Sequence, residues 1–144
     1  MVSFDNFTLT DGSPIYLQII RYMKQGIAAG SIGCQEEIPS RRALSALLGV
    51  NPNTIQKAYH MLEEEGIIVS RSGAKSFTCV NGEMVARIRR ELLTEETGLW
   101  VTAMQRLGMT KELAFALAEE VWENFPDTEN NVFYGEGSNH GKEI

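Results

Sequence analysis

Hydrophobic residues between positions 14 and 30 recur with the spacing of an α-helix that buries one face. Pro14 suits the first turn, where its missing N–H costs nothing, and Gly30 is a typical helix terminator. The apolar stripe consists of Tyr16, Ile19, Ile20, Met23 and Ile27. The pattern therefore predicts a first helix from 14 to 30, followed by a loop from 30 to 39.

Two shorter helices are predicted next, with a very short connection between them. Ser40 is placed to cap the first and Gly49 to close it, and then Asn51 and Pro52 follow almost at once as a second start. The second helix ends at Gly66. The apolar positions are Leu44, Leu47 and Leu48 in the first helix, and Ile55, Ala58, Tyr59 and Leu62 in the second. Two helices joined by a turn this short predict a helix-turn-helix.

A β-hairpin is expected after the helix-turn-helix. Residues 67–69 and 76–80 are β-prone runs, and they flank a polar, glycine-containing tip at 71–75. Three helices followed by a hairpin predict a winged helix. We therefore expect a mainly α fold with a small β-hairpin, in which residues 10–81 form a winged helix-turn-helix DNA-binding domain.

The helical pattern returns after this domain. Residues 84–107 read as one long helix, weakened at Gly98, and Thr110 can cap a further helix that ends near Phe125. We expect residues 82–126 to form a two-helix dimerisation region at the C-terminal side. Residues 127–144, rich in Asn, Gly and Glu, are predicted to form a mobile tail.

These last two helices carry more apolar surface than one small winged helix can cover. The residues concerned are Leu99, Trp100, Met104, Leu107, Leu113, Leu117, Val121 and Trp122. Monomers seldom expose an apolar patch of this kind, and a two-fold dimer would bury it. The alternative is that these side chains close a monomeric core.

The distribution of charge along the chain is more informative about a nucleic-acid partner than the net charge. The net charge of −6 argues against a nucleic-acid partner, yet residues 38–80 carry five basic and three acidic side chains, a net charge of +2. Hydrophobic residues make up 43% of the chain, as in ordinary globular proteins. A local basic face on an acidic chain favours specific DNA binding with limited non-specific affinity.

In a helix-turn-helix the second helix lies in the major groove, and its first residues reach the base edges. Asn53 and Gln56 could pair with adenine there, while Lys57 could reach guanine or a phosphate. The other candidate DNA contacts are Arg41, Arg42, Asn51, Thr54 and Lys75. The helix dipole disfavours positive charge in a first helical turn, where Arg41 and Arg42 are expected. A polyanion bound nearby would explain why two arginines stand there. The alternatives are that Asn51 and Thr54 only cap the helix and that Lys57 and His60 only face solvent.

The stretch 38–68 resembles the GntR family of bacterial regulators, and the string 51–54 followed by 57–59 resembles its YtrA subfamily. The resemblance implies a winged helix followed by a short two-helix dimerisation region, without a large effector domain. It also implies a transcription regulator, often a repressor of a transporter operon.

By motif position, the resemblance implies DNA contacts at Arg42, Asn51, Asn53, Thr54, Gln56, Ser72 and Gly73. The sequence departs from the family pattern at several places. Gln56 stands where many relatives have Arg, Gln35 replaces a usual Gly in the loop, and Ala74-Lys75 replaces a basic residue and Gly at the wing tip. These departures bear on one charged contact and on the shape of the wing.

No metal or cofactor is predicted. Cys34 and Cys79 are far apart in the sequence, without neighbouring ligands at metal-site spacing, so they are either ordinary reduced thiols or a redox switch. A phosphate-binding glycine loop and a Ser-His-Asp arrangement are both missing from the sequence, which argues against an enzyme. With no apolar run long enough for a membrane span and no signal peptide, we expect a cytoplasmic protein without a membrane partner.

The predicted partners are double-stranded operator DNA, a second copy of the chain and a small-molecule effector. No cluster of polar residues in the sequence indicates where the effector would bind. Two rival functions remain open at this point. One is a winged helix used for protein–protein contact, which would favour an acidic or apolar recognition face. The other is a ligand sensor in which DNA binding is secondary.

Overall fold

The computed structural model describes residues 1–71 and 75–126. The chain divides into two compact units, Met1–Arg89 and Arg90–Ile144, which are treated separately below. The predicted domain limits of 10–81 and 82–126 remain predictions, and the predicted tail at 127–144 lies outside the described residues. None of the helices in the described part of the chain is both long and apolar enough to cross a membrane.

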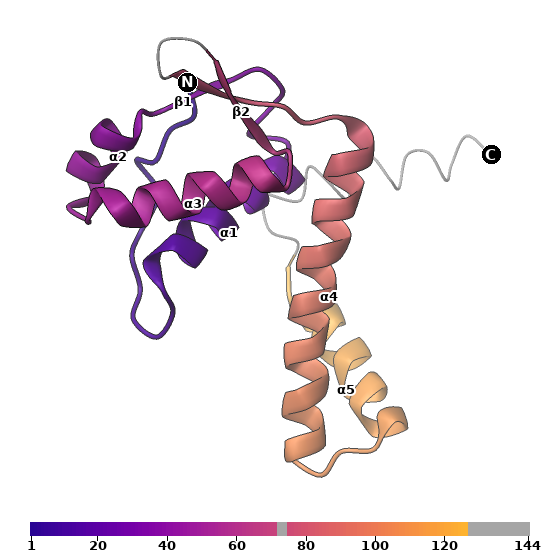
Figure 1. The fold of residues 1–144 in the computed structure, drawn as a ribbon. Helices are drawn as coiled ribbons and strands as arrows, with labels where there is room; N and C mark the ends of the chain where they lie inside the picture. Colours follow the sequence, from indigo (N-terminus) through magenta and orange to yellow (C-terminus); the bar gives the residue numbers. More distant parts are fainter. Residues whose placement is uncertain (72–74, 127–144) are drawn as a thin grey trace. The chain divides into compact units, whose positions relative to one another are not determined.

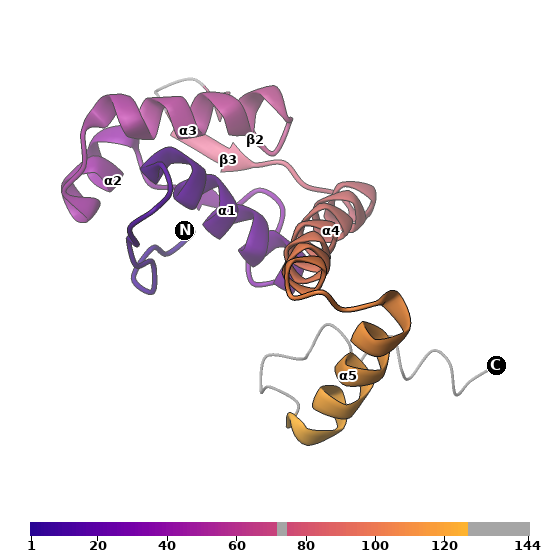
Figure 2. The same cartoon turned by 90° about the horizontal axis from the view of Figure 1, so that it is seen from below.

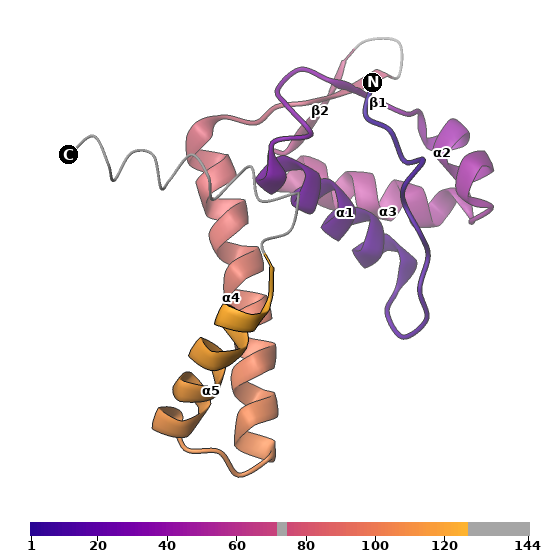
Figure 3. The same cartoon turned by 180° about the vertical axis from the view of Figure 1, so that it is seen from behind.

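The first unit contains three helices in the predicted order. α1 spans Ile15–Ala29, α2 spans Arg41–Leu48 and α3 spans Pro52–Glu64. α1 packs along α3, as Figures 1 and 3 show, and α2 packs against α3. The predicted stripe of α3 is buried as expected, and Leu44 of α2 is buried as well. The prediction that Leu47 belongs to the inner face was wrong, because its side chain is 58% exposed.

The helix-turn-helix begins and ends at the predicted caps. Ser40 Oγ accepts a hydrogen bond from the N–H of Ala43, and Asn51 Oδ1 accepts one from the N–H of Asn53. Between the two helices Gly49 adopts a left-handed conformation, with φ of 66°, which a residue with a side chain rarely adopts. Ser45 Oγ donates to the carbonyl of Val50 at 2.6 Å and so fastens the turn.

The predicted hairpin is present as two paired strands, and a third strand joins it to form a three-stranded antiparallel sheet. β1 spans Glu37–Ile38, β2 spans Ile68–Arg71 and β3 spans Lys75–Thr78, in the order β1-β3-β2. Figure 2 shows β2 and β3. The interpretation of residues 30–39 as loop alone was therefore incomplete. A strand of two residues is too short to produce an alternating pattern, so its pairing with β3 decides its conformation.

The N-terminal segment also belongs to the first unit, although the predicted domain began at residue 10. Val2 and Phe4 are buried, and the N–H of Val2 donates to the carbonyl of Glu37 at 2.8 Å. Phe4 also lies against the ring of Tyr22 on α1, with 5.0 Å between ring centroids. This segment therefore extends the core of the unit over one side of α1.

α4 spans Gly82–Arg106 and runs without interruption through Gly98, so the weakness predicted there does not break the helix. α5 spans Lys111–Asn124, with Thr110 as the predicted N-cap. In the second unit the C-terminal part of α4 lies beside α5 (Figure 1), and the rings of Trp100 and Phe115 stack at 5.9 Å.

Candidate nucleic-acid interface

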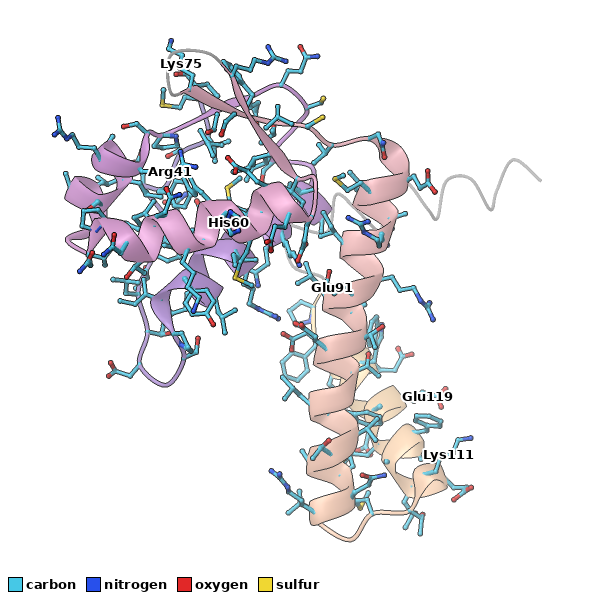
Figure 4. The ribbon with its side chains drawn as sticks, viewed as in Figure 1. Arg41, His60, Lys75, Glu91, Lys111 and Glu119 are labelled. Carbon is cyan, nitrogen blue, oxygen red and sulfur yellow. The ribbon has the colours of Figure 1, made fainter. Side chains whose placement is uncertain are left out.

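The outer face of α3 carries the polar side chains that were predicted to meet DNA. Asn53, Gln56, Lys57 and His60 are all exposed, whereas Ile55 on the opposite side of the helix is fully buried. Figure 4 shows His60 on this face. The amphipathic pattern of α3 thus presents two amides and a cation to solvent on its N-terminal half.

The N-terminus of α3 is half occupied by its own cap. Asn51 Oδ1 accepts from the N–H of Asn53 at 2.8 Å, and the carbonyl of Asn51 accepts from the N–H of Thr54 at 2.9 Å. The expectation that Asn51 serves as a cap is therefore confirmed. The side-chain amide N–H₂ of Asn51 remains exposed beside the positive end of the helix dipole, where anions are favoured.

Lys57 is held in place by a contact that the sequence did not reveal. Its Nζ lies 4.0 Å from the centroid of the Tyr16 ring, across the gap between α3 and α1. The helical spacing of Tyr16 predicts a core residue. Its contact with Lys57 could therefore be recognised only in the folded chain. A cation over an aromatic face is attracted by about 0.5–1 kcal/mol at exposed sites, and the Lys57 side chain remains exposed in this contact.

Arg41 and Arg42 differ in their surroundings although they are neighbours in the first turn of α2. Arg41 turns toward α3 (Figure 4), where its Nη2 lies 3.3 Å from Glu63 Oε1 and its guanidinium lies 5.3 Å from the centre of the Tyr59 ring. Arg42 is exposed, and within the described residues it forms no ion pair. Arg42 is therefore the freer of the two charges.

Two further contacts fix the surroundings of Arg41. Tyr59 donates from its hydroxyl to the carbonyl of Pro39 at 2.7 Å, and burial raises the pKa of this hydroxyl although the charge of Arg41 opposes the shift. Glu63 also accepts a hydrogen bond from the Ser70 hydroxyl on β2. Glu63 thus joins α2, α3 and the sheet through one carboxylate.

We call the β2–β3 hairpin the wing. Arg71 and Lys75 face each other across the last pair of the ladder. Lys75 Nζ lies 3.5 Å from Glu37 Oε1 on β1, while the guanidinium of Arg71 lies 4.8 Å from the centre of the Phe77 ring. Ser72 and Gly73, which were also predicted to contact DNA, lie outside the described residues, as does Ala74.

A separate apolar surface lies on the second unit. Of the residues predicted to dimerise, those with exposed side chains are Leu99, Leu107, Leu113, Leu117, Val121 and Trp122, and Trp100 and Met104 are half-buried. The side chain of Trp122 is 77% exposed. Ala114 is the one described hydrophobic residue of this unit that is buried. Among the described residues of this unit, most of the side chains predicted to dimerise are therefore exposed.

Residues 1–126 thus contain a helix-turn-helix with an antiparallel wing, which is the fold of a class of DNA-binding proteins. Residues 15–77 match the family model described as bacterial regulatory proteins, gntR family. The HTH-type transcriptional regulator YhcF of Bacillus subtilis (strain 168) is 34% identical over 99 residues, 69% of this chain and 82% of its own. The chain belongs to the GntR family, whose members are DNA-binding transcription regulators rather than enzymes.

Two further comparisons agree with this assignment. A GntR family transcriptional regulator from Listeria monocytogenes superposes with a TM-score of 0.68 at 30% identity, over 78% of this chain and 98% of its own. The HTH-type transcriptional repressor YtrA of Bacillus subtilis (strain 168) is 39% identical over 71 residues, 49% of this chain and 55% of its own. The resemblance to the family and the predicted winged helix are confirmed.

Proposed function

We propose that the chain is a homodimeric transcription repressor that binds a palindromic operator in double-stranded DNA. The observation that carries this proposal is the exposed polar face on the N-terminal half of α3, flanked by the free charge of Arg42. A helix-turn-helix inserts this part of its second helix into the major groove. Side chains on the first turns of such a helix read base edges, and α3 carries polar side chains there.

Base reading is assigned to two amides. Asn53 and Gln56 are one helical turn apart and both exposed, so they can address neighbouring base pairs, each pairing with adenine through both atoms of its amide. Lys57 stands beside them and donates to guanine or to a phosphate. With Gln56 in place of the Arg found in many relatives, one charged contact on α3 is either lost or moved to Lys57.

Phosphate binding is assigned to the groups around the helix starts. Arg42 projects from α2, and Asn51 and Thr54 lie at the start of α3 beside the positive end of its dipole. Arg41 adds positive charge at the start of α2, and its ion pair with Glu63 offsets part of that charge. On the wing, Lys75 contributes a further cation, and Ser72 and Gly73 extend the contact by motif position.

Dimerisation is assigned to residues 82–126. The exposed apolar side chains of α4 and α5 would cost free energy if they faced water, at about 25 cal/mol for each Å² of apolar surface. A two-fold axis through this surface buries it on both copies and presents two copies of α3 to two halves of one DNA site. The matching halves of a palindrome are what such a dimer would select.

Three finer parts of the proposal have narrower support. Repression is suggested by the name of the relative YtrA, which is described as a transcriptional repressor. A transporter operon as the target and a small-molecule effector rest on the family resemblance alone. They concern which genes are regulated and when, whereas the DNA contacts concern how the operator is bound.

The experiment that tests the proposal is a selection of bound duplexes from a random-sequence DNA pool with the full chain, read by sequencing. We expect enrichment of one palindromic site. An Asn53→Ala variant should enrich a site with relaxed preference at one position in each half. Arg87→Ala, which alters an exposed charge of α4 outside the apolar dimerisation surface, should enrich the original site. A pool without enrichment would contradict the proposal and favour a winged helix that contacts proteins.

A further inference from the structure

The turn at residues 33–36 lies against the end of β3, and each of these two segments carries one cysteine. Cys34 is in this turn, and Cys79 directly follows the last residue of β3. Both thiols are free and exposed. Neither has a part in the proposed DNA contacts or in dimerisation.

Thr78 fastens the turn to the strand through both its backbone and its side chain. Its carbonyl accepts from the N–H of Gln35 at 2.8 Å, and its N–H donates to the carbonyl of Glu36 at 2.9 Å. Its hydroxyl donates to the carbonyl of Gly33 at 2.6 Å and accepts from the N–H of Glu36 at 2.9 Å. Because Thr78 is almost fully buried, these bonds are shielded from water and fix the turn firmly.

This hydrogen-bond pattern is that of a β-bulge in which Gln35 and Glu36 together oppose Thr78. Gln35 has a φ of 57°, as the first residue of such a bulge requires. The bond from the N–H of Gln35 to the carbonyl of Thr78 joins the peptide group after Cys34 to the peptide group before Cys79. Cys34 and Cys79 therefore flank this hydrogen bond on the same side, and an antiparallel ladder continued past it would place their Cα atoms roughly 5 Å apart.

We propose that Cys34 and Cys79 form a reversible intramolecular disulfide when the protein meets a hydroperoxide. A disulfide spans Cα separations of about 4.4–6.8 Å, and the separation expected from the ladder lies within this range. The closed bond fastens the 33–36 turn covalently to the end of β3, and the stability of the first unit then depends on the redox state of its surroundings.

The chemistry balances with a hydroperoxide as the oxidant. One thiolate attacks the peroxide oxygen and becomes a sulfenic acid, while the O–O bond breaks and the other oxygen leaves as water or an alcohol. The second thiol then attacks the sulfenic sulfur, the S–S bond forms, and the sulfenic oxygen leaves as water. Each cysteine is oxidised by one electron, and the peroxide accepts both electrons and the two thiol protons. A dithiol reductant reverses the bond by thiol–disulfide exchange.

The test uses the full chain, reduced, purified and treated with a stoichiometric amount of hydrogen peroxide. Non-reducing peptide mapping by mass spectrometry should recover a linked pair of peptides that contain Cys34 and Cys79 from a single chain. Because the bond closes a long loop, thermal unfolding of the oxidised form should shift upward by at least about 5 °C, and dithiothreitol should restore the original midpoint.

Cys34→Ser and Cys79→Ser serve as matched variants, since both positions are exposed and the replacement keeps size and polarity. In each variant peroxide should leave the melting midpoint unchanged, and the remaining cysteine should carry a sulfenic acid. Alanine replacements at the same positions repeat the comparison if a serine variant fails to fold. Two unmodified thiols after peroxide treatment, linkage only between chains, or a linked chain with an unchanged midpoint would overturn the proposal.

Discussion

Replacing Arg41 or Arg42 by alanine removes the same charge from neighbouring positions, and we expect the two variants to fail in different assays. Arg41 contacts Glu63 at 3.3 Å and covers the ring of Tyr59, so Arg41→Ala removes contacts inside the first unit. Arg42 is exposed, so Arg42→Ala removes only what that side chain does outside the chain.

The magnitudes follow from these surroundings. The partly buried ion pair and the cation–π contact of Arg41 are together worth about 1–2 kcal/mol, which would lower the melting midpoint by roughly 5–10 °C for a unit of this size. The Nε of Arg41 is buried and has no hydrogen-bond partner within the described residues, and its removal offsets part of that loss. Arg42→Ala should change the midpoint by less than about 3 °C.

Operator binding should show the opposite order. A phosphate contact of Arg42 is worth about 1–2 kcal/mol in each protomer, so its loss should weaken binding roughly 10-fold or more. Each lost contact also lowers the slope of log affinity against log salt by about one, and a dimer loses two. Fluorescence anisotropy with the selected duplex over a salt series, together with thermal unfolding, measures both effects. Arg87→Ala is the charge-matched control.

If Arg42→Ala bound the operator with unchanged affinity and salt slope, the docking of α2 and α3 on DNA would be wrong. If Arg41→Ala left the melting midpoint unchanged, the inward contact with Glu63 would contribute nothing to stability. These two results are independent, because one concerns a surface and the other concerns packing.

Three further predictions concern stability and assembly. Gln35→Gly should stabilise the reduced chain by about 0.5–1 kcal/mol in urea unfolding, because φ of 57° is strained for glutamine; a loss of stability would show that its side chain matters more. Tyr59→Phe should cost about 1–2 kcal/mol in the same assay, since the carbonyl of Pro39 loses its donor, and an unchanged midpoint would mean that water replaces the hydroxyl. Trp122→Glu should convert the dimer to a monomer in size-exclusion chromatography with light scattering, and a dimer that persists would move the interface elsewhere.

The local signals of the sequence were sufficient for the helix starts and for the buried face of α3. The cap residues Ser40, Asn51 and Thr110 form the hydrogen bonds that their types predict, because capping depends only on residues within one turn. The buried stripe of α3 was predictable for the same reason, since the helical period alone decides which side chains share a face.

What the sequence could not reveal depends on contacts between distant segments. β1 exists because Glu37 and Ile38 pair with β3. Val2 and Phe4 are buried where Val2 bonds to Glu37 and Phe4 packs on Tyr22. Leu47 fits a helical stripe but lies beyond the edge of the core, so no partner covers it.

In the candidate site, the exposure of Asn53 and Gln56 was predictable from helical spacing. The inward turn of Arg41 was not, because it depends on Glu63, which lies far along the chain. The support of Lys57 by Tyr16 was hidden for the same reason. The hydrophobic pattern therefore predicts which face of a helix is polar. Contacts between distant segments decide which charged side chains on that face are held by other residues.

The measurement that tests the central claim most directly is native mass spectrometry of the full chain on the duplex recovered by selection. We predict two chains bound to one palindromic duplex whose half-site centres lie about one helical turn apart, and loss of the two-chain complex when either half is scrambled. One chain on each duplex, or equal binding to the scrambled duplex, would contradict the account of a dimeric, sequence-specific regulator.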